Sequence, residues 1–196
     1  MRGETTRRRD ASHTRQLLLD TARHHFARYG FSTTTVRDIA DGAGVNVALI
    51  NRYFASKEGL FEACLSSAVT DLRRETDSAP ANEIAAKMAQ RIAGSADDPR
   101  HHETMLLLVR SSGDERTDAM RRALLTSIST RLASAVQSSP EPPGDAALLR
   151  AQLLIGALLG ASLMRTSIAV PPLATANEAQ ISDALEVLVK ALLPPG

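Results

Sequence analysis

Apolar residues recur at helical spacing along most of this chain. Leu18, Ala22 and Phe26 fall on one stripe of a helix that we expect from about Ser12 to Tyr29. The stretch from Lys57 to Asp77 keeps the same helical period throughout. No convincing run of alternating β-branched residues is present, so strands are not expected. The pattern therefore predicts an all-α protein.

Helix-breaking residues divide the rest of the chain. Asp98-Pro99, Gly113, the Pro140 to Gly144 loop and Pro171-Pro172 interrupt stretches with helical spacing. They do so because proline lacks a backbone donor and glycine favours turns. Together with two short helices between residues 35 and 53, this predicts about nine helices. The later helices are expected at about residues 81–94, 100–111, 114–137, 145–168 and 177–193.

The longest apolar run extends from Ala151 to Met164. It is too short for a membrane span, which needs about 20 apolar residues. A helix of a soluble protein that is apolar nearly all round must be buried on more than one side. We expect one face in the core and one against a twin subunit; a fully internal helix in a monomer is the alternative. The expected dimer interface includes Gln152, Gly156, Gly160, Leu185 and Leu188.

A segment in the N-terminal third has the spacing of a helix-turn-helix followed at once by another helix. Thr35 and Asp38 are spaced as a capping box at the start of its first helix. Gly44 lies where the chain must reverse, because glycine takes a positive φ at little cost. Asn46 is a good N-cap for the second helix, expected from Val47 to Tyr53.

The second helix of this segment has an inner and an outer face. Ile50 is expected on the inner face, and Val47, Ala48, Asn51 and Arg52 remain on the outside. Two short helices of this kind can hold the second one in the major groove of DNA. We therefore expect a DNA-binding regulator; an αα-hairpin with no such role is the alternative.

The same residues carry a family resemblance. The run VRDIADGAGVNVALINRYFASKEGLF resembles the N-terminal DNA-binding domain of the TetR family of transcriptional regulators, and the preceding LLLDTARHHFARYGFSTTT resembles that family's first helix. The resemblance covers about residues 12 to 62. It implies an all-α homodimer whose variable C-terminal domain binds a small ligand that switches DNA binding off. Asn51 departs from the family, which usually has an aromatic residue there, so the base preference is open.

The resemblance also implies the residues that would contact DNA. The residues expected at phosphates are Thr35, Asn46, Tyr53 and Lys57. Those expected to face the groove are Arg37, Val47, Ala48 and Asn51, with Arg37 suited to guanine. Arg7, Arg8 and Arg9 are expected to reach the adjacent minor groove.

Length and charge agree with this organisation. The chain has 196 residues and a net charge of +1, but residues 1–60 carry a net +4 and residues 61–196 a net −3. The basic end is thus the end with the motif. We expect residues 1–10 to be a disordered basic arm and residues 11–62 to be a three-helix helix-turn-helix domain. Residues 63–196 would form an antiparallel helical bundle for ligand binding and dimerisation.

The expected function is a ligand-responsive repressor. It would bind a palindromic operator on double-stranded DNA as a homodimer and be released by a small, largely apolar effector. Methionines fit adaptable apolar sites, and a few polar groups orient a guest. The expected effector-lining residues are Met105, Leu108, Arg110, Met120, Leu124, Ile128, Ser162 and Arg165.

Other classes of protein and site are less well supported by the sequence. Cys64 is the single cysteine, which excludes an intrachain disulfide and a cysteine cluster; it is expected in the core. Residues 101–103, His-His-Glu, are expected at a solvated helix start, so neither a metal nor a cofactor is predicted. No enzymatic signature stands out, and no signal peptide is visible, so we expect a cytoplasmic protein without a membrane partner. A helical protein-interaction module without an effector is the alternative function.

Overall fold

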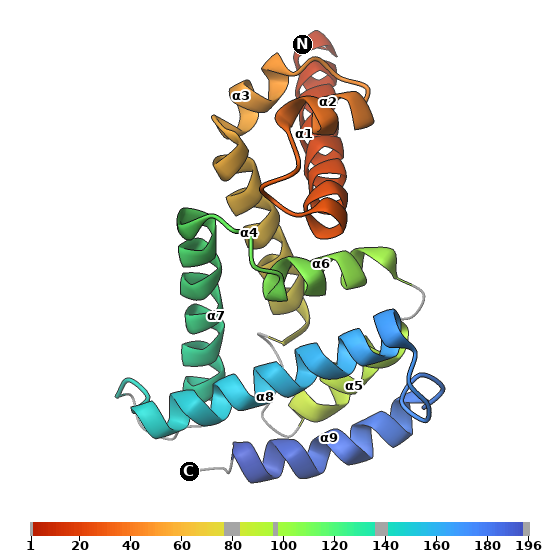
Figure 1. The fold of residues 1–196 in the computed structure, drawn as a ribbon, viewed down its shortest axis with the longest axis vertical. Helices are drawn as coiled ribbons and strands as arrows, with labels where there is room; N and C mark the ends of the chain where they lie inside the picture. Colours follow the sequence, from red (N-terminus) through yellow and green to blue (C-terminus); the bar gives the residue numbers. More distant parts are fainter. Residues whose placement is uncertain (1, 77–82, 96–97, 136–140, 194–196) are drawn as a thin grey trace.

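A computed structural model describes residues 2–76, 83–95, 98–135 and 141–193, and all regular structure in these ranges is helical. The expected all-α architecture is confirmed. Figure 1 shows the helices in two groups that α4 connects. The helices are α1 (Arg2–Tyr29), α2 (Val36–Gly42), α3 (Ala48–Phe54), α4 (Lys57–Thr76), α5 (Ile84–Gly94), α6 (Pro99–Val109), α7 (Glu115–Ala135), α8 (Asp145–Leu163), the π-helical segment η3 (Met164–Ile168) and α9 (Glu178–Leu192).

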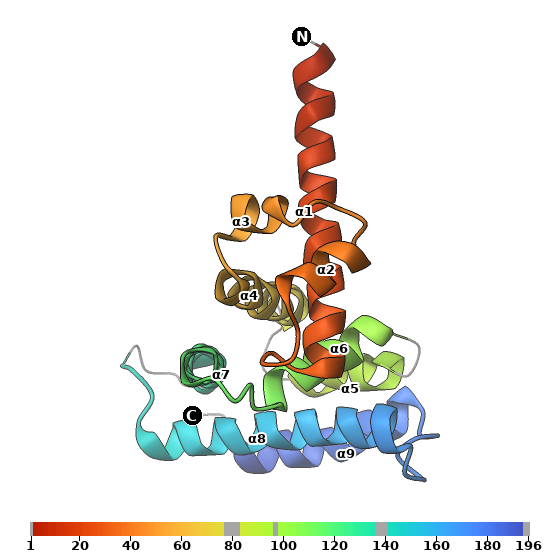
Figure 2. The same ribbon diagram turned by 45° about the horizontal axis from the view of Figure 1, so that its top comes forward.

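The first helix begins earlier than the sequence predicted. We expected a disordered arm over residues 1–10, but α1 begins at Arg2, and Figure 2 shows its N-terminal part projecting beyond the other helices. The expectation was wrong because no proline lies before Ser12 and arginine is a good helix former. The basic residues of this segment therefore belong to a helical backbone rather than to an extended chain.

The helices of the N-terminal half share one aromatic centre. Phe26 of α1, Phe31 of the following loop and Phe61 of α4 are buried, with ring centroids 5.2 to 5.7 Å apart. Ile39 and Ile50 complete the same cluster from α2 and α3. Because Phe61 belongs to the long helix α4, the short helices are anchored to the element that continues into the C-terminal half.

The C-terminal half forms a second core between α5, α8 and α9 (Figure 1). Ala151 and Leu154 of α8 are fully buried there, and Ile181, Leu185 and Val189 supply the inner face of α9. Leu185 was expected in a dimer interface, but its side chain is in this core. The expectation was wrong because the rotation of α9 depends on what it packs against, which the spacing alone does not give.

The opposite face of α8 is left uncovered. Leu149 and Leu153 are 57% and 54% exposed, so the alternative of a fully internal helix is contradicted. Within the described ranges, the stretch Asp145–Ile168 is the one helix long and apolar enough to cross a membrane by length and composition. Only 17% of the 18-residue apolar window in this helix is buried inside the protein. An apolar helix with one bare face suits packing against a further surface.

Candidate nucleic-acid interface

Helix α2 begins with the expected capping box. The backbone N–H of Asp38 donates to Thr35 Oγ1 at 3.1 Å, and the backbone N–H of Thr35 donates to Asp38 Oδ2 at 2.8 Å. The Thr35 hydroxyl also donates to Asp38 Oδ2, and these hydrogen bonds lower the pKa of the Asp38 carboxyl. The box satisfies backbone donors that would otherwise lack partners and fixes where α2 starts.

The turn between α2 and α3 is a Schellman motif. Gly44 has a φ of +64°, and its N–H donates to the carbonyl of Asp41 at 3.1 Å. The N–H of Val45 donates to the carbonyl of Ala40 at 3.0 Å. This pairing closes α2 and reverses the chain within a few residues, because glycine takes the left-handed conformation without strain.

Helix α3 presents an exposed face over a buried one. The backbone N–H of Ala48 donates to Asn46 Oδ1 at 2.8 Å, which confirms the expected cap. Ile50 and Phe54 are buried, while Val47, Ala48, Asn51 and Arg52 are exposed. The face expected to read DNA is therefore open to solvent, and the core holds the helix from behind.

The corner between α3 and α4 is tightly closed. The Ser56 hydroxyl accepts from the N–H of Gly59 at 3.1 Å and thereby caps the N-terminus of α4. A Cβ added to Gly59 would lie 2.1 Å from the carbonyl oxygen of Phe54. Only glycine permits this approach, so the corner fixes the direction of α3 relative to α4.

The expected phosphate contacts are only partly exposed. The Lys57 ammonium lies 4.2 Å from the centre of the Phe31 ring, and partial burial lowers its pKa, although the carboxylates of Glu58, Asp114 and Asp38 oppose this. Tyr53 is half-buried, with the Arg52 guanidinium above its ring. Of the other residues expected at phosphates, Thr35 and Asn46 are exposed, and so is Arg37, which was expected to face the groove.

The remaining expected DNA contacts, Arg7, Arg8 and Arg9, belong to α1 by their backbone, and their side chains lie outside the described part of the structure. A helical backbone at this point differs from the flexible arm that we expected in the minor groove.

Several expected effector-lining residues meet in one apolar cluster. Met105 and Leu108 of α6 are buried in the N-terminal core cluster, and Met120 and Leu124 of α7 pack against it. Ile128 is half-buried farther along α7. Ser162 of α8 is buried beside His101, with 3.4 Å between its Oγ and the histidine Nε2.

Two arginines expected at the effector bind backbone carbonyls. Arg110 donates from Nη1 to the carbonyls of Ala27 and Arg28 at 3.1 and 3.0 Å, at the C-terminal end of α1. Arg165 donates to the carbonyls of Leu173 and Ala176 in the loop before α9. These bonds form because the last carbonyls of a helix and the carbonyls of a loop need donors, and arginine has five; an effector contact by either arginine stays a prediction.

The His-His-Glu stretch also differs from the solvated helix start that we expected. His101 is only 6% exposed, and its Nδ1 accepts from Arg91 Nε at 3.2 Å. His102 contacts Thr166 of η3, and Glu103 pairs with His24 of α1 at 2.7 Å. These residues therefore connect α6 to four neighbouring elements, α1, α5, α8 and η3. Across the described residues, no group of three His, Cys, Asp or Glu could hold a metal ion.

Cys64 is a core residue, as its neighbours predicted. It is fully buried, its Sγ lies 3.6 Å from the carbonyl oxygen of Leu19, and burial raises the pKa of its thiol to about 12. A thiol with so high a pKa is unreactive, because the thiolate is the nucleophile.

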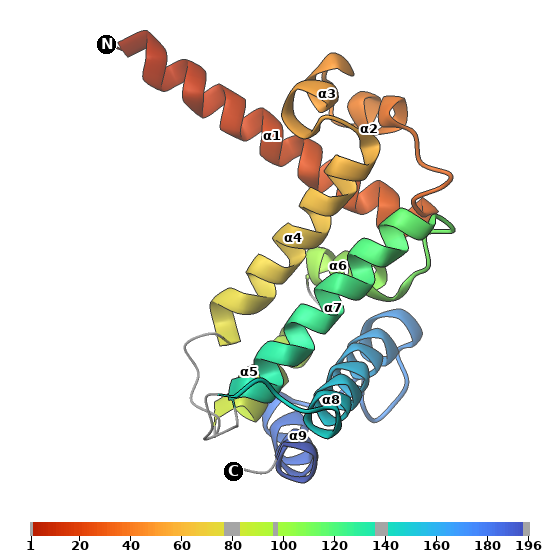
Figure 3. The same cartoon turned by 90° about the vertical axis from the view of Figure 1, so that its left-hand side faces the viewer.

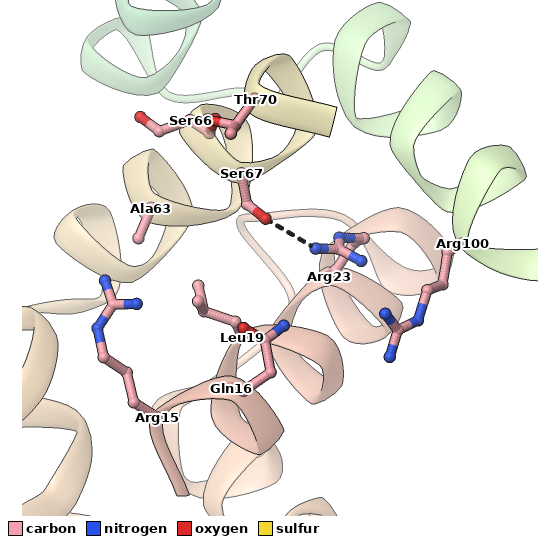
Figure 4. Close-up of a pocket in the computed structure, with 9 residues that line it drawn as sticks. All are labelled: Arg15, Gln16, Leu19, Arg23, Ala63, Ser66, Ser67, Thr70 and Arg100. Atoms are coloured by element: carbon pink, nitrogen blue, oxygen red, sulfur yellow. Dashed lines mark hydrogen bonds between the residues drawn. The ribbon is translucent and has the colours of Figure 1, made fainter. Parts of the chain in front are cut away.

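A polar cavity between α1, α4 and α6 was not predicted from the sequence. Arg15, Arg23 and Arg100 line it (Figure 4). Arg15 and Arg23 are eight residues apart, which places them on one face of α1 beside the apolar stripe. That spacing was a visible signal, but Arg100 comes from another helix and could be added only by the fold.

Known proteins match both halves of the chain. Residues 18–64 match the family model described as "Bacterial regulatory proteins, tetR family", and residues 82–193 match the one described as "Tetracyclin repressor-like, C-terminal domain". The HTH-type transcriptional regulator BetI of Agrobacterium fabrum is 28% identical over 187 residues, covering 90% of this chain and 88% of BetI.

Two further proteins are similar to this chain. The HTH-type transcriptional repressor AcnR of Corynebacterium glutamicum is 31% identical over 114 residues, covering 57% of this chain and 56% of AcnR. The solved structure of the SmeT-triclosan complex has a TM-score of 0.65 at 20% identity, covering 93% of this chain and 95% of that one. The structural likeness extends over both halves of the fold.

Proposed function

Because this chain belongs to the TetR family of bacterial regulatory proteins, we propose that it is a repressor that binds a palindromic operator as a homodimer. Family membership itself makes it a DNA-binding transcriptional regulator. The repressor role is supported by AcnR, a relative named as a transcriptional repressor. A cytoplasmic location, where the operator would be, is part of the same proposal.

The observation that carries the proposal is the exposed face of α3. Val47, Ala48 and Asn51 point away from the core, while Ile50 behind them is fully buried. Small apolar side chains can contact thymine methyl groups, and an amide can pair with adenine through two hydrogen bonds. Arg37 on the adjoining α2 is exposed and would supply a guanine contact.

A homodimer is supported by the uncovered face at the other end of the molecule. Leu149, Gln152, Leu153, Gly156 and Gly160 have the spacing of one face of α8. A Cβ added to either glycine would meet no atom within 4 Å, so the centre of this face is flat and open. Two copies joined here must place their α3 helices about 34 Å apart, or a multiple of that, to enter successive major grooves.

The proposed effector is small and largely apolar and binds between α6, α7 and α8. The support is the cluster formed by Met105, Leu108, Met120 and Leu124, next to α4. SmeT, a structural neighbour, was solved as a complex with triclosan. An effector that separates these side chains would move α4 and change the spacing of the two α3 helices in the dimer. For this to happen, the effector must bind the arrangement with the changed spacing more tightly than the arrangement that fits the operator. Couplings of this kind are typically about 1–3 kcal/mol.

The DNA-binding proposal is tested with full-length protein. Selection from random duplexes should recover a palindrome, and its labelled form then reports affinity by fluorescence anisotropy. Asn51→Ala and Arg37→Ala should each weaken binding by roughly 10- to 100-fold, because each removes a contact to a base edge. Arg122→Ala is the matched control, since Arg122 lies exposed on α7 and pairs with Glu115. Equal affinities for all three variants, or recovery of no preferred sequence, would contradict the proposal.

A further inference from the structure

The cavity between α1, α4 and α6 has a volume of about 460 Å³ and a predominantly polar lining. Arg15 and Arg23 approach it from α1, Arg100 from α6, and Ser66 and Ser67 from α4 (Figure 4). The cavity thus lies where the DNA-binding half, the connecting helix and the C-terminal half meet. None of the residues expected to line the apolar effector site takes part in it.

Arg23 is a buried cation without a full set of partners. It is only 2% exposed, yet its Nε has no hydrogen-bond acceptor. Its two other contacts are long, at 3.4 Å from Nη1 to Asp20 Oδ1 and 3.3 Å from Nη2 to Ser67 Oγ. A buried donor that lacks an acceptor is costly, so an acceptor that enters the cavity would be stabilised by Arg23.

The charges around the cavity are unbalanced. Asp20 is the acidic partner of both Arg23 and Arg100, with 2.9 Å between its Oδ2 and Arg100 Nη2. Arg15 has its guanidinium above the Phe54 ring, 5.0 Å from the centre. These residues therefore contribute three positively charged guanidinium groups and a single negatively charged carboxylate. Planar guanidinium groups bind carboxylates and phosphates through paired hydrogen bonds, and an apolar guest would strip water from the arginines without replacing it.

We propose that this cavity binds a small organic anion with at least two carboxylate or phosphate groups. One anionic group pairs with Arg23 and Arg100, and a second pairs with Arg15, with hydroxyl donors from α4. The bound anion ties α1 to α4 and α6 and thereby changes the affinity for the operator; this second part rests on the proposed function. The apolar effector and the anion are thus separate inputs to the same protein.

Binding is measured by isothermal titration calorimetry on the full chain, with succinate and pyrophosphate as the two probes at constant ionic strength. At least one probe should bind saturably, and the probe that binds more tightly identifies the anionic group. Arg100→Gln and Arg15→Gln should each weaken that binding at least about tenfold, because each removes a charged donor pair. Both side chains are largely exposed, so neither substitution threatens the core. Arg122→Gln, on the exposed side of α7, is the control and should bind like the wild type.

Two results overturn the binding site: neither probe binds, or the Arg100, Arg15 and Arg122 variants all bind like the wild type. The regulatory part is measured as the operator affinity with and without the better probe. The regulatory part is supported if the probe changes the operator affinity of the wild type but not that of Arg100→Gln. An equal change of operator affinity in both proteins refutes it. If the proposed function is wrong, the protein will show no preference for any DNA sequence even when no anion is present. The binding of the anion measured by calorimetry would be unaffected.

Discussion

At the scale of the residue, the environment of each arginine decides its role. Arg110 and Arg165 hold backbone carbonyls, Arg23 lies buried beside a cavity, and Arg37 is exposed next to α3. The guanidinium group suits all of these sites because it offers donors in several directions. Only the surrounding atoms distinguish a residue that holds the fold together from one that meets DNA or a small anion.

Glycine at position 59 gives a prediction at this scale. Gly59→Ala should lower the free energy of unfolding by about 1–3 kcal/mol, because the new Cβ would meet the Phe54 carbonyl. It should also weaken operator binding, since relief of the clash moves the end of α3. Gly94→Ala is the matched control; its Cβ would meet nothing within 4 Å, and the change should stay within about 1 kcal/mol of the wild type. Urea denaturation of both variants checks this, and equal stabilities would show that the corner is not tight.

At the scale of the element, α6 contacts both halves of the molecule beside the connecting helix α4. Its N-terminal residues reach α1 through the Arg100–Asp20 and Glu103–His24 pairs, and His101 and His102 reach α8 and η3. Its apolar residues Leu107 and Leu108 lie in the N-terminal core cluster. Helix α6 therefore makes contacts in both halves of the molecule.

His101 gives a pH-dependent prediction for this helix. Burial, and then the nearby Arg91, lower the pKa of His101 from 6.5 to about 4, while Asp98 opposes the shift. The unfolded chain therefore takes up a proton at a higher pH than the folded chain does. Stability from this group is fully present above about pH 6.5 and is lost as the pH falls toward 4.

The loss should be roughly 1–3 kcal/mol across this window. Urea denaturation at several pH values checks it, with His101→Asn as the comparison, because other carboxylates and histidines also titrate there. The difference in unfolding free energy between wild type and variant should shrink as the pH falls. A difference that is constant from pH 7 to pH 4 would mean that His101 is not held neutral in the fold.

At the scale of the whole molecule, the exposed surfaces at its two ends differ in kind. The end with α3 carries exposed polar and small apolar residues, whereas the end with α8 and α9 exposes large apolar side chains, including Val187 at 71%. Helix α4 extends from one group of helices to the other and packs beside α7 (Figures 1 and 3). A regulator that dimerises at one end and reads DNA at the other needs such a rigid connection to fix its reading distance.

The dimer proposal predicts the behaviour of two variants. Leu153→Glu and Val187→Asp should convert the dimer to monomers, because charges would be buried against an apolar partner surface without compensation. Size-exclusion chromatography with light scattering measures the mass, and Ser127→Asp on the exposed side of α7 is the control. A monomeric wild type, or variants that keep the dimer mass, would contradict the use of this face. Helical circular dichroism should stay unchanged, since both side chains lie outside the core.

The sequence by itself determined the features that depend on neighbouring residues. The capping box at Thr35, the reversal at Gly44 and the cap at Asn46 all formed as predicted, because the donors and acceptors involved lie within a few residues of one another. For the same reason the helix boundaries set by prolines and glycines were close to those observed.

Only the tertiary structure decided how the helix faces are used. The burial of Leu185, the binding of carbonyls by Arg110, and the meeting of Arg23 with Arg100 each depend on how helices far apart in the sequence cross. Periodicity gives an apolar face but not its partner, and a charged residue on a helix surface acquires its role from whatever packs nearby. The exposed face of α3 could thus be located from the sequence, whereas the arginine-lined cavity appeared only in the fold.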